Sequence, residues 1–175
     1  MNTEVTYIIL PKRLGDKLRE KAEEIGYLPE ELGLELVRNS LNEELDPEDL
    51  AEHYQALSEK YLKDAKELLS KGDRVQTQPF KKALTENASQ KLWGATALAI
   101  KTVAAKRGLK LRKHGSLWEF IDRLSEESGD EELITLFNGA NALHRNFYEN
   151  EMTQRAVEIT AKDIEKLIAK LKQRK

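Results

Sequence analysis

Apolar residues recur along most of this chain at intervals of three and four, the spacing that places side chains on one face of an α-helix. From residue 50 onward, one stretch, LWGATALAIKTVAA, is apolar almost all round, as expected for a helix that other helices surround. Gly72-Asp73, Gly108 and Gly129-Asp130 interrupt the pattern, and Ser116 opens what reads as a capping box. The pattern predicts an up-and-down bundle of five helices, and therefore a mostly α-helical protein.

The beginning of the chain follows a different pattern. Its segment TEVTYIIL, residues 3–10, is rich in β-branched and aromatic residues and predicts a strand. Pro11 opens a helix that Gly26 closes, and Pro29 opens a second helix that continues to Leu45. We therefore expect two parts, a strand-helix-helix unit over residues 1–46 and a helical bundle over residues 47–175, joined at the DPED segment.

This order of elements resembles the ribbon-helix-helix unit of Arc- and CopG-like repressors. The resemblance rests on Leu10-Pro11 after the strand, on Leu14 and Leu18, and on Gly26 before a second amphipathic helix. A ribbon-helix-helix unit pairs its strand with the strand of a second protomer. The resemblance therefore implies that residues 1–46 form a dimerisation segment and that the protein is a homodimer.

Sequence-specific DNA binding is not favoured by the residues that would carry it. The strand positions facing away from the helices would be Val5, Tyr7 and Ile9, and of these only the Tyr7 hydroxyl can hydrogen-bond to a base edge. Residues 1–46 hold six Lys and Arg against eleven Asp and Glu. DNA-binding proteins gain most of their affinity by neutralising phosphates, so this excess of acid disfavours DNA as a partner.

Composition indicates a soluble cytoplasmic protein. The chain has no cysteine, which excludes disulfides and thiolate metal sites and fits a reducing compartment. Its longest strongly apolar stretch, residues 92–100, is far shorter than the roughly 20 residues that a membrane span requires. The N-terminus carries no basic residues ahead of its apolar ones and does not resemble a signal peptide, so we expect no membrane partner.

The larger part of the chain resembles a known family. The runs YLKDAKELLSKGD, ASQKLWGATALAIKTVAAKRGLKL, KHGSLWEFIDRL and ALHRNFYENEM occur in the order typical of the archaeal PaREP family, which is related to the HEPN superfamily. The resemblance covers residues 50–171 and implies a HEPN-like helical bundle that pairs with itself. It implies no reaction, although other HEPN-like branches include RNA-cutting toxins and partners of nucleotidyltransferases.

The stretch NALHRNFYENEM places His144 beside Arg145. RNA-cutting HEPN proteins carry an Arg followed, after four to six residues, by a His. Counting on from Arg145, positions 150–152 hold Asn, Glu and Met instead. Neighbouring residues of a helix diverge by about 100°, so His144 and Arg145 do not share a face. We therefore predict that His144 has a structural role and that the chain has no catalytic residue. If the protein is a nuclease instead, the candidate catalytic residues are His144, Arg145 and His114, with a histidine of one protomer reaching Arg145 of the other across a dimer.

A basic run, KTVAAKRGLKLRKHG, offers candidate phosphate contacts in Lys110, Arg112 and Lys113, to which Arg145 and Asn141 can be added. The alternative is that these cations simply suit a helix C-terminus and keep a loop solvated. The three histidines, His53, His114 and His144, lack the spacing of metal ligands, so we expect neither a metal nor a cofactor.

These observations favour a non-catalytic, dimeric binding or interaction module whose ligand is a nucleotide, RNA or a protein partner. A metal-independent toxin-type ribonuclease is the alternative, and a ribbon-helix-helix DNA-binding regulator is the least favoured possibility.

Overall fold

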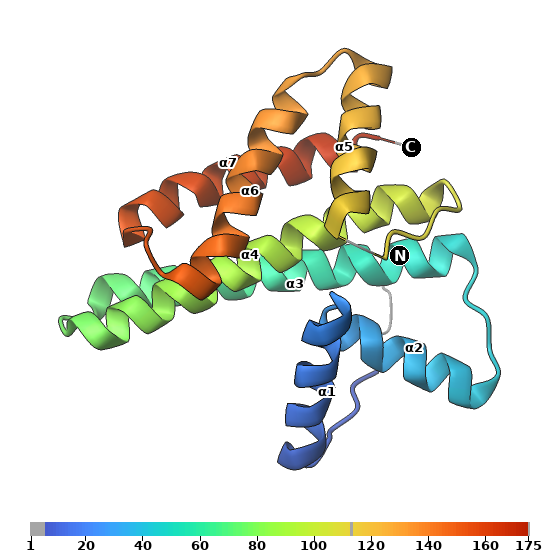
Figure 1. Ribbon diagram of the computed structural model, residues 1–175, viewed down its shortest axis with the longest axis horizontal. Helices are drawn as coiled ribbons and strands as arrows, with labels where there is room; N and C mark the ends of the chain where they lie inside the picture. Colours follow the sequence, from blue (N-terminus) through green and yellow to red (C-terminus); the bar gives the residue numbers. More distant parts are fainter. Residues whose placement is uncertain (1–5, 113, 175) are drawn as a thin grey trace.

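The computed structural model describes residues 6–112 and 114–174, which form seven α-helices joined by short connections (Figure 1). The helices are α1 (Lys12–Ile25), α2 (Pro29–Leu41), α3 (Pro47–Arg74), α4 (Gln78–Lys106), α5 (His114–Ser128), α6 (Glu132–Glu149) and α7 (Gln154–Lys172). None of these described helices is both long enough and apolar enough to cross a membrane.

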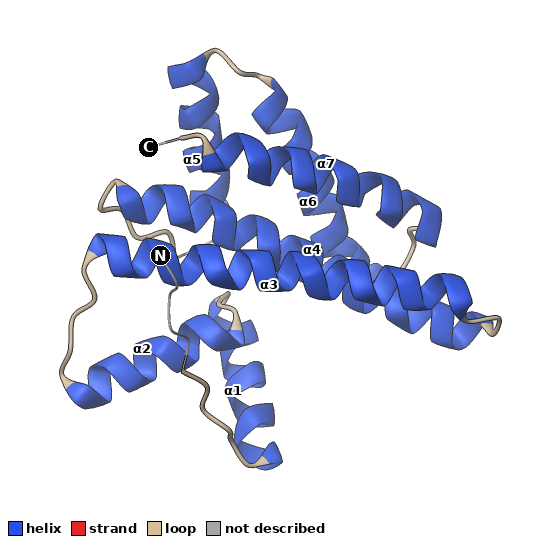
Figure 2. Ribbon diagram, turned by 180° about the vertical axis from the view of Figure 1, so that it is seen from behind, coloured by secondary structure: helices blue, strands red, loops and turns tan. Residues whose placement is uncertain are grey.

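A long antiparallel hairpin of α3 and α4 runs through the middle of the molecule. Helices α5, α6 and α7 lie on one side of this hairpin, and α1 and α2 lie on the other, as the views from front and back both show (Figures 1 and 2). The bundle predicted from residue 47 onward is therefore present in α3–α7, and its central member is α4.

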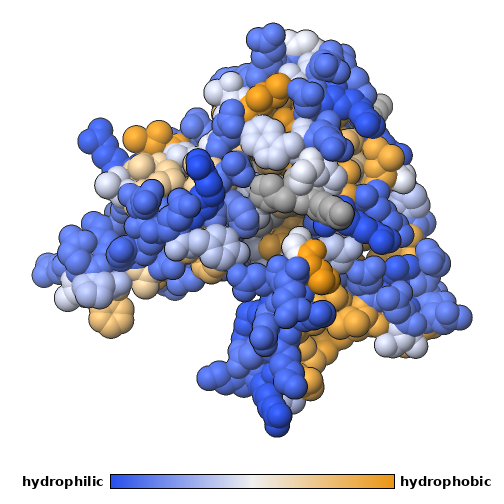
Figure 3. All heavy atoms as spheres, viewed as in Figure 1, coloured by the Kyte–Doolittle hydropathy of each residue, from blue (hydrophilic) through white to orange (hydrophobic). Residues whose placement is uncertain are grey.

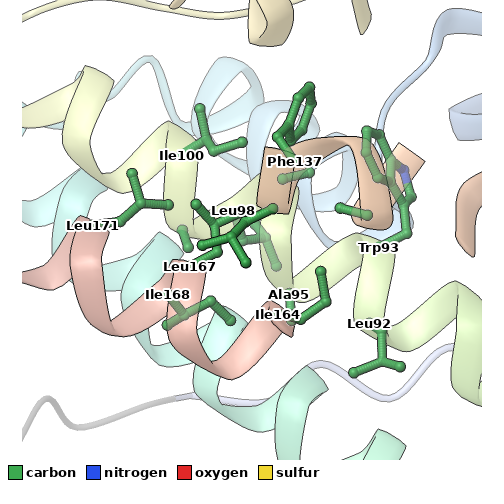
Figure 4. Packing of buried hydrophobic residues seen from close by; sticks show 14 of the residues in the cluster. Leu92, Trp93, Ala95, Leu98, Ile100, Phe137, Ile164, Leu167, Ile168 and Leu171 are labelled. Atoms are coloured by element: carbon green, nitrogen blue, oxygen red, sulfur yellow. The ribbon is translucent and has the colours of Figure 1, made fainter. Parts of the chain in front are cut away.

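The core lies where α4 meets the C-terminal helices. Leu98 and Ile100 of α4, Phe137 of α6, and Ile164 and Leu167 of α7 are completely buried, and Figure 4 shows several of their neighbours around them. Because α4 is covered by α3 on one side and by α5, α6 and α7 on the other, it needs apolar residues all round. The prediction drawn from LWGATALAIKTVAA is confirmed.

Several helix ends follow their local sequence signals. Gly26 and Gly129 adopt positive φ angles of 74° and 66° after α1 and α5, a conformation that glycine adopts without strain. The side chain of Asp46 accepts hydrogen bonds from the first turn of α3, and Thr153 does the same for α7.

Three predicted boundaries are wrong. Gly72 lies inside α3 and is buried there, Ser116 lies inside α5 and does not precede it, and α2 ends at Leu41, before Leu45. A glycine is tolerated inside a long helix whose packing compensates its weak helix propensity. At the end of α2, Asn42 takes a left-handed conformation with φ of 58°, and this stops the helix early.

The predicted strand is not present. Residues 6–11 form neither helix nor strand, no strand occurs anywhere in the described residues, and the first part of the predicted strand, residues 3–5 with Val5, lies outside them (Figure 2). The apolar, β-branched composition was misleading because a strand also requires a neighbouring strand to complete its hydrogen bonds, and residues 6–112 and 114–174 supply none. The expected strand-helix-helix unit, and with it the ribbon-helix-helix fold, is therefore wrong.

Candidate functional site

A pocket lies where α2 approaches the α3–α4 hairpin and the loop that follows α4. It encloses about 70 Å³ and joins four separate parts of the chain. Its lining residues are Tyr27, Glu31, Leu34, Glu35, Arg38, Leu45, Leu50, Tyr54, Lys101, Leu109, Lys110, Leu111 and Arg112.

A buried ion pair joins two of the lining helices. The Lys101 ammonium of α4 donates to a carboxylate oxygen of Glu31 of α2 at 2.5 Å, and the two side chains are only 7% and 5% exposed. The other oxygen of Glu31 accepts a hydrogen bond from the backbone N–H of Leu28 at 3.0 Å. The carboxylate therefore caps the start of α2 while it neutralises the one lysine that interrupts the apolar stretch of α4.

Two tyrosines, Tyr27 and Tyr54, line the pocket. Burial raises the pKa of Tyr54 well above its usual range, and the nearby Glu31 carboxylate adds to this shift. Burial also raises the pKa of Tyr27, reinforced by Glu35 and opposed by Arg112. Both phenols therefore stay protonated at neutral pH and can donate hydrogen bonds to an anion.

The remaining lining cations lie nearer to solvent. Lys110 and Arg112 are exposed on the loop after α4. Arg38 of α2 is 19% exposed and forms an ion pair of 3.1 Å with Glu44, whose side chain is 85% exposed. Because Glu31 already neutralises Lys101 and only Glu35 remains among the lining carboxylates, the outer part of the pocket is cationic.

The pocket can hold only a small group. Sites for drug-sized ligands usually enclose about 300–1,000 Å³, whereas this pocket has about 70 Å³. A single anionic head group fits this space, and the remainder of a larger ligand would have to lie over the exposed side chains of Lys110 and Arg112.

The structure brings some of the predicted phosphate contacts together and separates others. Lys110 and Arg112 both line the pocket, while Lys113 lies outside the described residues. Arg145 and Asn141 are on α6, which contributes nothing to the pocket lining. Arg145 is exposed.

The histidines are distributed over three helices. His144 is half-buried on α6, where its ring lies 4.7 Å from that of Trp93 and 5.6 Å from that of Tyr148. His53 is on α3, and His114 is the first residue of α5, where its side chain is not described. Across residues 6–112 and 114–174, no group of three or more His, Cys, Asp or Glu side chains is arranged to hold a metal ion.

Of the thirteen lining residues, only Lys110 and Arg112 were predicted from the sequence. The polar residues that were missed are Tyr27, Glu31, Glu35, Arg38, Tyr54 and Lys101. One signal was available, because Lys101 stands alone within an otherwise apolar stretch of α4. A lysine that is forced into a protein interior requires an acidic partner. Nothing in the spacing of residues indicates which of the 31 acidic residues that partner is.

The fold and the pocket define a class, an all-helical bundle with a small, outwardly cationic pocket between its central hairpin and its N-terminal helices. Within that class, the chain belongs to the Archaeal PaREP1/PaREP8 family, which it matches over residues 53–168, more than half of its length. No curated protein and no solved structure matches the chain. The matched residues include Lys101, Lys110 and Arg112, whereas the residues that α2 contributes to the pocket precede the match.

Proposed function

We propose that the protein is a non-catalytic, dimeric binding module that holds a phosphate-bearing ligand, a nucleotide or RNA, in this pocket. The observation that carries the proposal is the convergence of Arg38, Lys110 and Arg112 on a pocket that also contains two protonated tyrosines. The choice of nucleotide or RNA as ligand also relies on the expected resemblance of residues 47–175 to HEPN bundles.

Phosphate is the head group that suits this lining best. An arginine guanidinium can donate two parallel hydrogen bonds to a phosphate, and a lysine adds a point charge. The ion pair between Arg38 and Glu44 is weak because Glu44 is exposed, so Arg38 can turn to a ligand at little cost. Lys101 has a structural role here, since Glu31 already satisfies it.

The rest of a nucleotide or of an RNA strand can lie over the exposed outer part of the pocket. Only the phosphate can enter a space of about 70 Å³, so the sugar and base would lie outside it, near Tyr27 and Leu109. The face of a tyrosine ring is a suitable surface for a base, and such stacking contributes about 1–3 kcal/mol in single-strand complexes.

The residues proposed for a nuclease support the non-catalytic interpretation. His144 packs against Trp93, and the exposed Arg145 follows it on the next helical position, so the two side chains point in different directions. A general base must stand within hydrogen-bond reach of the proton that it removes, close to the cation that holds the phosphate.

The test is a binding screen with four probes: inorganic phosphate, ATP, a single-stranded oligoribonucleotide and duplex DNA, each at two salt concentrations. We expect phosphate and either ATP or RNA to bind, with an affinity that falls as salt rises. Lys110→Ala/Arg112→Ala should weaken binding at least a hundredfold, because each lost hydrogen bond to a charged group costs about 1.5–3 kcal/mol. The matched control, Arg155→Ala/Lys162→Ala, removes two exposed cations of α7 and should change little.

Three outcomes would overturn the proposal. The first is that none of the four probes binds. The second is that the control variant weakens binding as much as the pocket variant does. The third is cleavage of the RNA without added metal, with loss of cleavage in Arg145→Ala, which would establish the ribonuclease alternative.

A further inference from the structure

Exposed apolar side chains gather on the N-terminal helices and the segment before them. We define the N-terminal apolar face as Tyr7, Ile8, Ile9, Leu10, Leu14, Ile25, Leu36, Val37 and Leu41, all of which are between 37% and 94% exposed. Figure 3 shows apolar surface in the angle between α1 and α2, beside the polar outer side of α1.

The other exposed apolar residues do not form such a group. Phe80, Leu109, Tyr148 and Ile159 belong to α4, the loop after it, α6 and α7. Single exposed apolar residues are normal on protein surfaces, whereas a contiguous apolar face usually marks an interaction site. The N-terminal apolar face therefore has the character of an interaction site.

The charges of α1 indicate which partner fits. Its first half carries Lys12, Arg13, Lys17 and Arg19 against Asp16 alone, and its second half carries Glu20, Glu23 and Glu24 against Lys21 alone. A helix that is basic at one end and acidic at the other is complementary to a second copy of itself running in the opposite direction. In a parallel arrangement the like charges would face each other.

The helical positions agree with this arrangement. Leu14 and Ile25 are eleven residues apart, about three helical turns, so they share one stripe of α1; Leu18 of the same stripe is half-buried beside Gly33 of α2. Lys17 and Glu24 flank that stripe on the same side, seven residues apart. A two-fold axis between them would bring Lys17 of each copy beside Glu24 of the partner subunit, and the contact would occur twice.

Glu24 is available for this exchange. It now forms an ion pair of 2.7 Å with Lys21, but the two side chains are 55% and 64% exposed. Exposed pairs three residues apart on a helix contribute little to stability, so Glu24 can change partner at small cost.

We propose that two copies of this chain associate through their N-terminal apolar faces, with the α1 helices packed antiparallel. This inference rests on the homodimer of the proposed function but not on its pocket. It uses the helices of the N-terminal segment and requires no strand.

The first experiment measures the mass of the full chain by light scattering and its dissociation constant by sedimentation equilibrium. We expect a dimer at micromolar concentration. Leu14→Glu should weaken association on the order of a hundredfold, since it places a carboxylate in the apolar interface twice. The matched control is Ile159→Glu, which changes an equally exposed isoleucine of α7 and should leave the dimer intact.

The second experiment tests the orientation. Lys17→Glu should weaken the dimer about tenfold, because two attractive contacts become repulsive. The double exchange Lys17→Glu/Glu24→Lys should restore the wild-type dissociation constant, because it re-creates both pairs with the signs reversed.

The inference would be overturned if the wild type is a monomer at 100 micromolar, or if Leu14→Glu leaves the dimer unchanged. The antiparallel arrangement would be overturned if the double exchange does not restore association. Binding of phosphate and RNA is measured separately on the same variants. A wild type that binds these probes as a monomer would refute the interface while leaving the pocket intact.

Discussion

Breaking the buried pair between Lys101 and Glu31 should loosen the attachment of α1 and α2 to the bundle. In Lys101→Met, an apolar side chain of similar length replaces the lysine, and the Glu31 carboxylate is left 5% exposed without its cation. Removing one member of a buried ion pair typically costs about 3–5 kcal/mol, because the remaining charge stays desolvated. This is a large part of the roughly 5–15 kcal/mol by which most domains are stable.

The structure indicates which helices should lose stability in Lys101→Met. Helix α2 is held to the hairpin near its N-terminus, by the Glu31 pair, by the hydrogen bond of 2.5 Å from the Tyr61 hydroxyl to Glu30, and by Leu28 beside Gly94. Losing the first of these contacts should therefore free residues 12–41 before the remaining helices unfold. In Lys101→Met, amide hydrogen exchange should accelerate in α1 and α2 while α4, α6 and α7 remain protected.

A double-mutant cycle isolates the pair itself. Glu31→Gln keeps a side-chain oxygen that can accept from the Leu28 N–H, so it removes the charge and preserves the cap. Stabilities from urea unfolding should show that Glu31→Gln/Lys101→Met costs less than the sum of the two single changes by about 2–3 kcal/mol. A loss below about 1 kcal/mol in Lys101→Met, with unchanged exchange in α1 and α2, would refute this account of the pair.

Two further predictions concern the central hairpin. A methyl group added by Gly94→Ala would lie 2.4 Å from Cδ2 of Tyr61, whose buried ring is held by the hydrogen bond to Glu30. We therefore expect the free energy of unfolding, measured in urea, to fall by about 1–3 kcal/mol. In the control Gly115→Ala, the added methyl group meets no atom within 4 Å and should not destabilise the protein. Burial lowers the pKa of His53, so the unfolded chain binds a proton more readily than the folded one below about pH 6.5. Stability should therefore be complete above that pH and decline as the pH falls through the folded-state pKa; a His53→Gln variant with the same decline would contradict this assignment.

The sequence by itself determined the helices of this protein. The period of the apolar residues located all seven, Gly26 and Gly129 marked helix ends, and the apolar character of α4 identified the central helix. These features depend on residues close together in the chain, where side-chain spacing and backbone conformation act locally. Strand formation is not local, since it requires a second backbone, and the strand predicted from residue 3 is absent from its described part, residues 6–10, for that reason.

The pocket and the ion pair were decided by tertiary structure. Lys110 and Arg112 stood out as candidate phosphate contacts in the sequence, but nothing in it placed them beside Tyr27, Arg38 and Tyr54. Those residues come from α2, α3 and the segments around them, and they meet where α2 is held against the hairpin by contacts such as the ion pair between Glu31 and Lys101, which are 70 positions apart in the sequence. Which acidic residue reaches that lysine depends on how the helices pack, because the cost of burying a charge is removed only by a partner within hydrogen-bond distance in three dimensions.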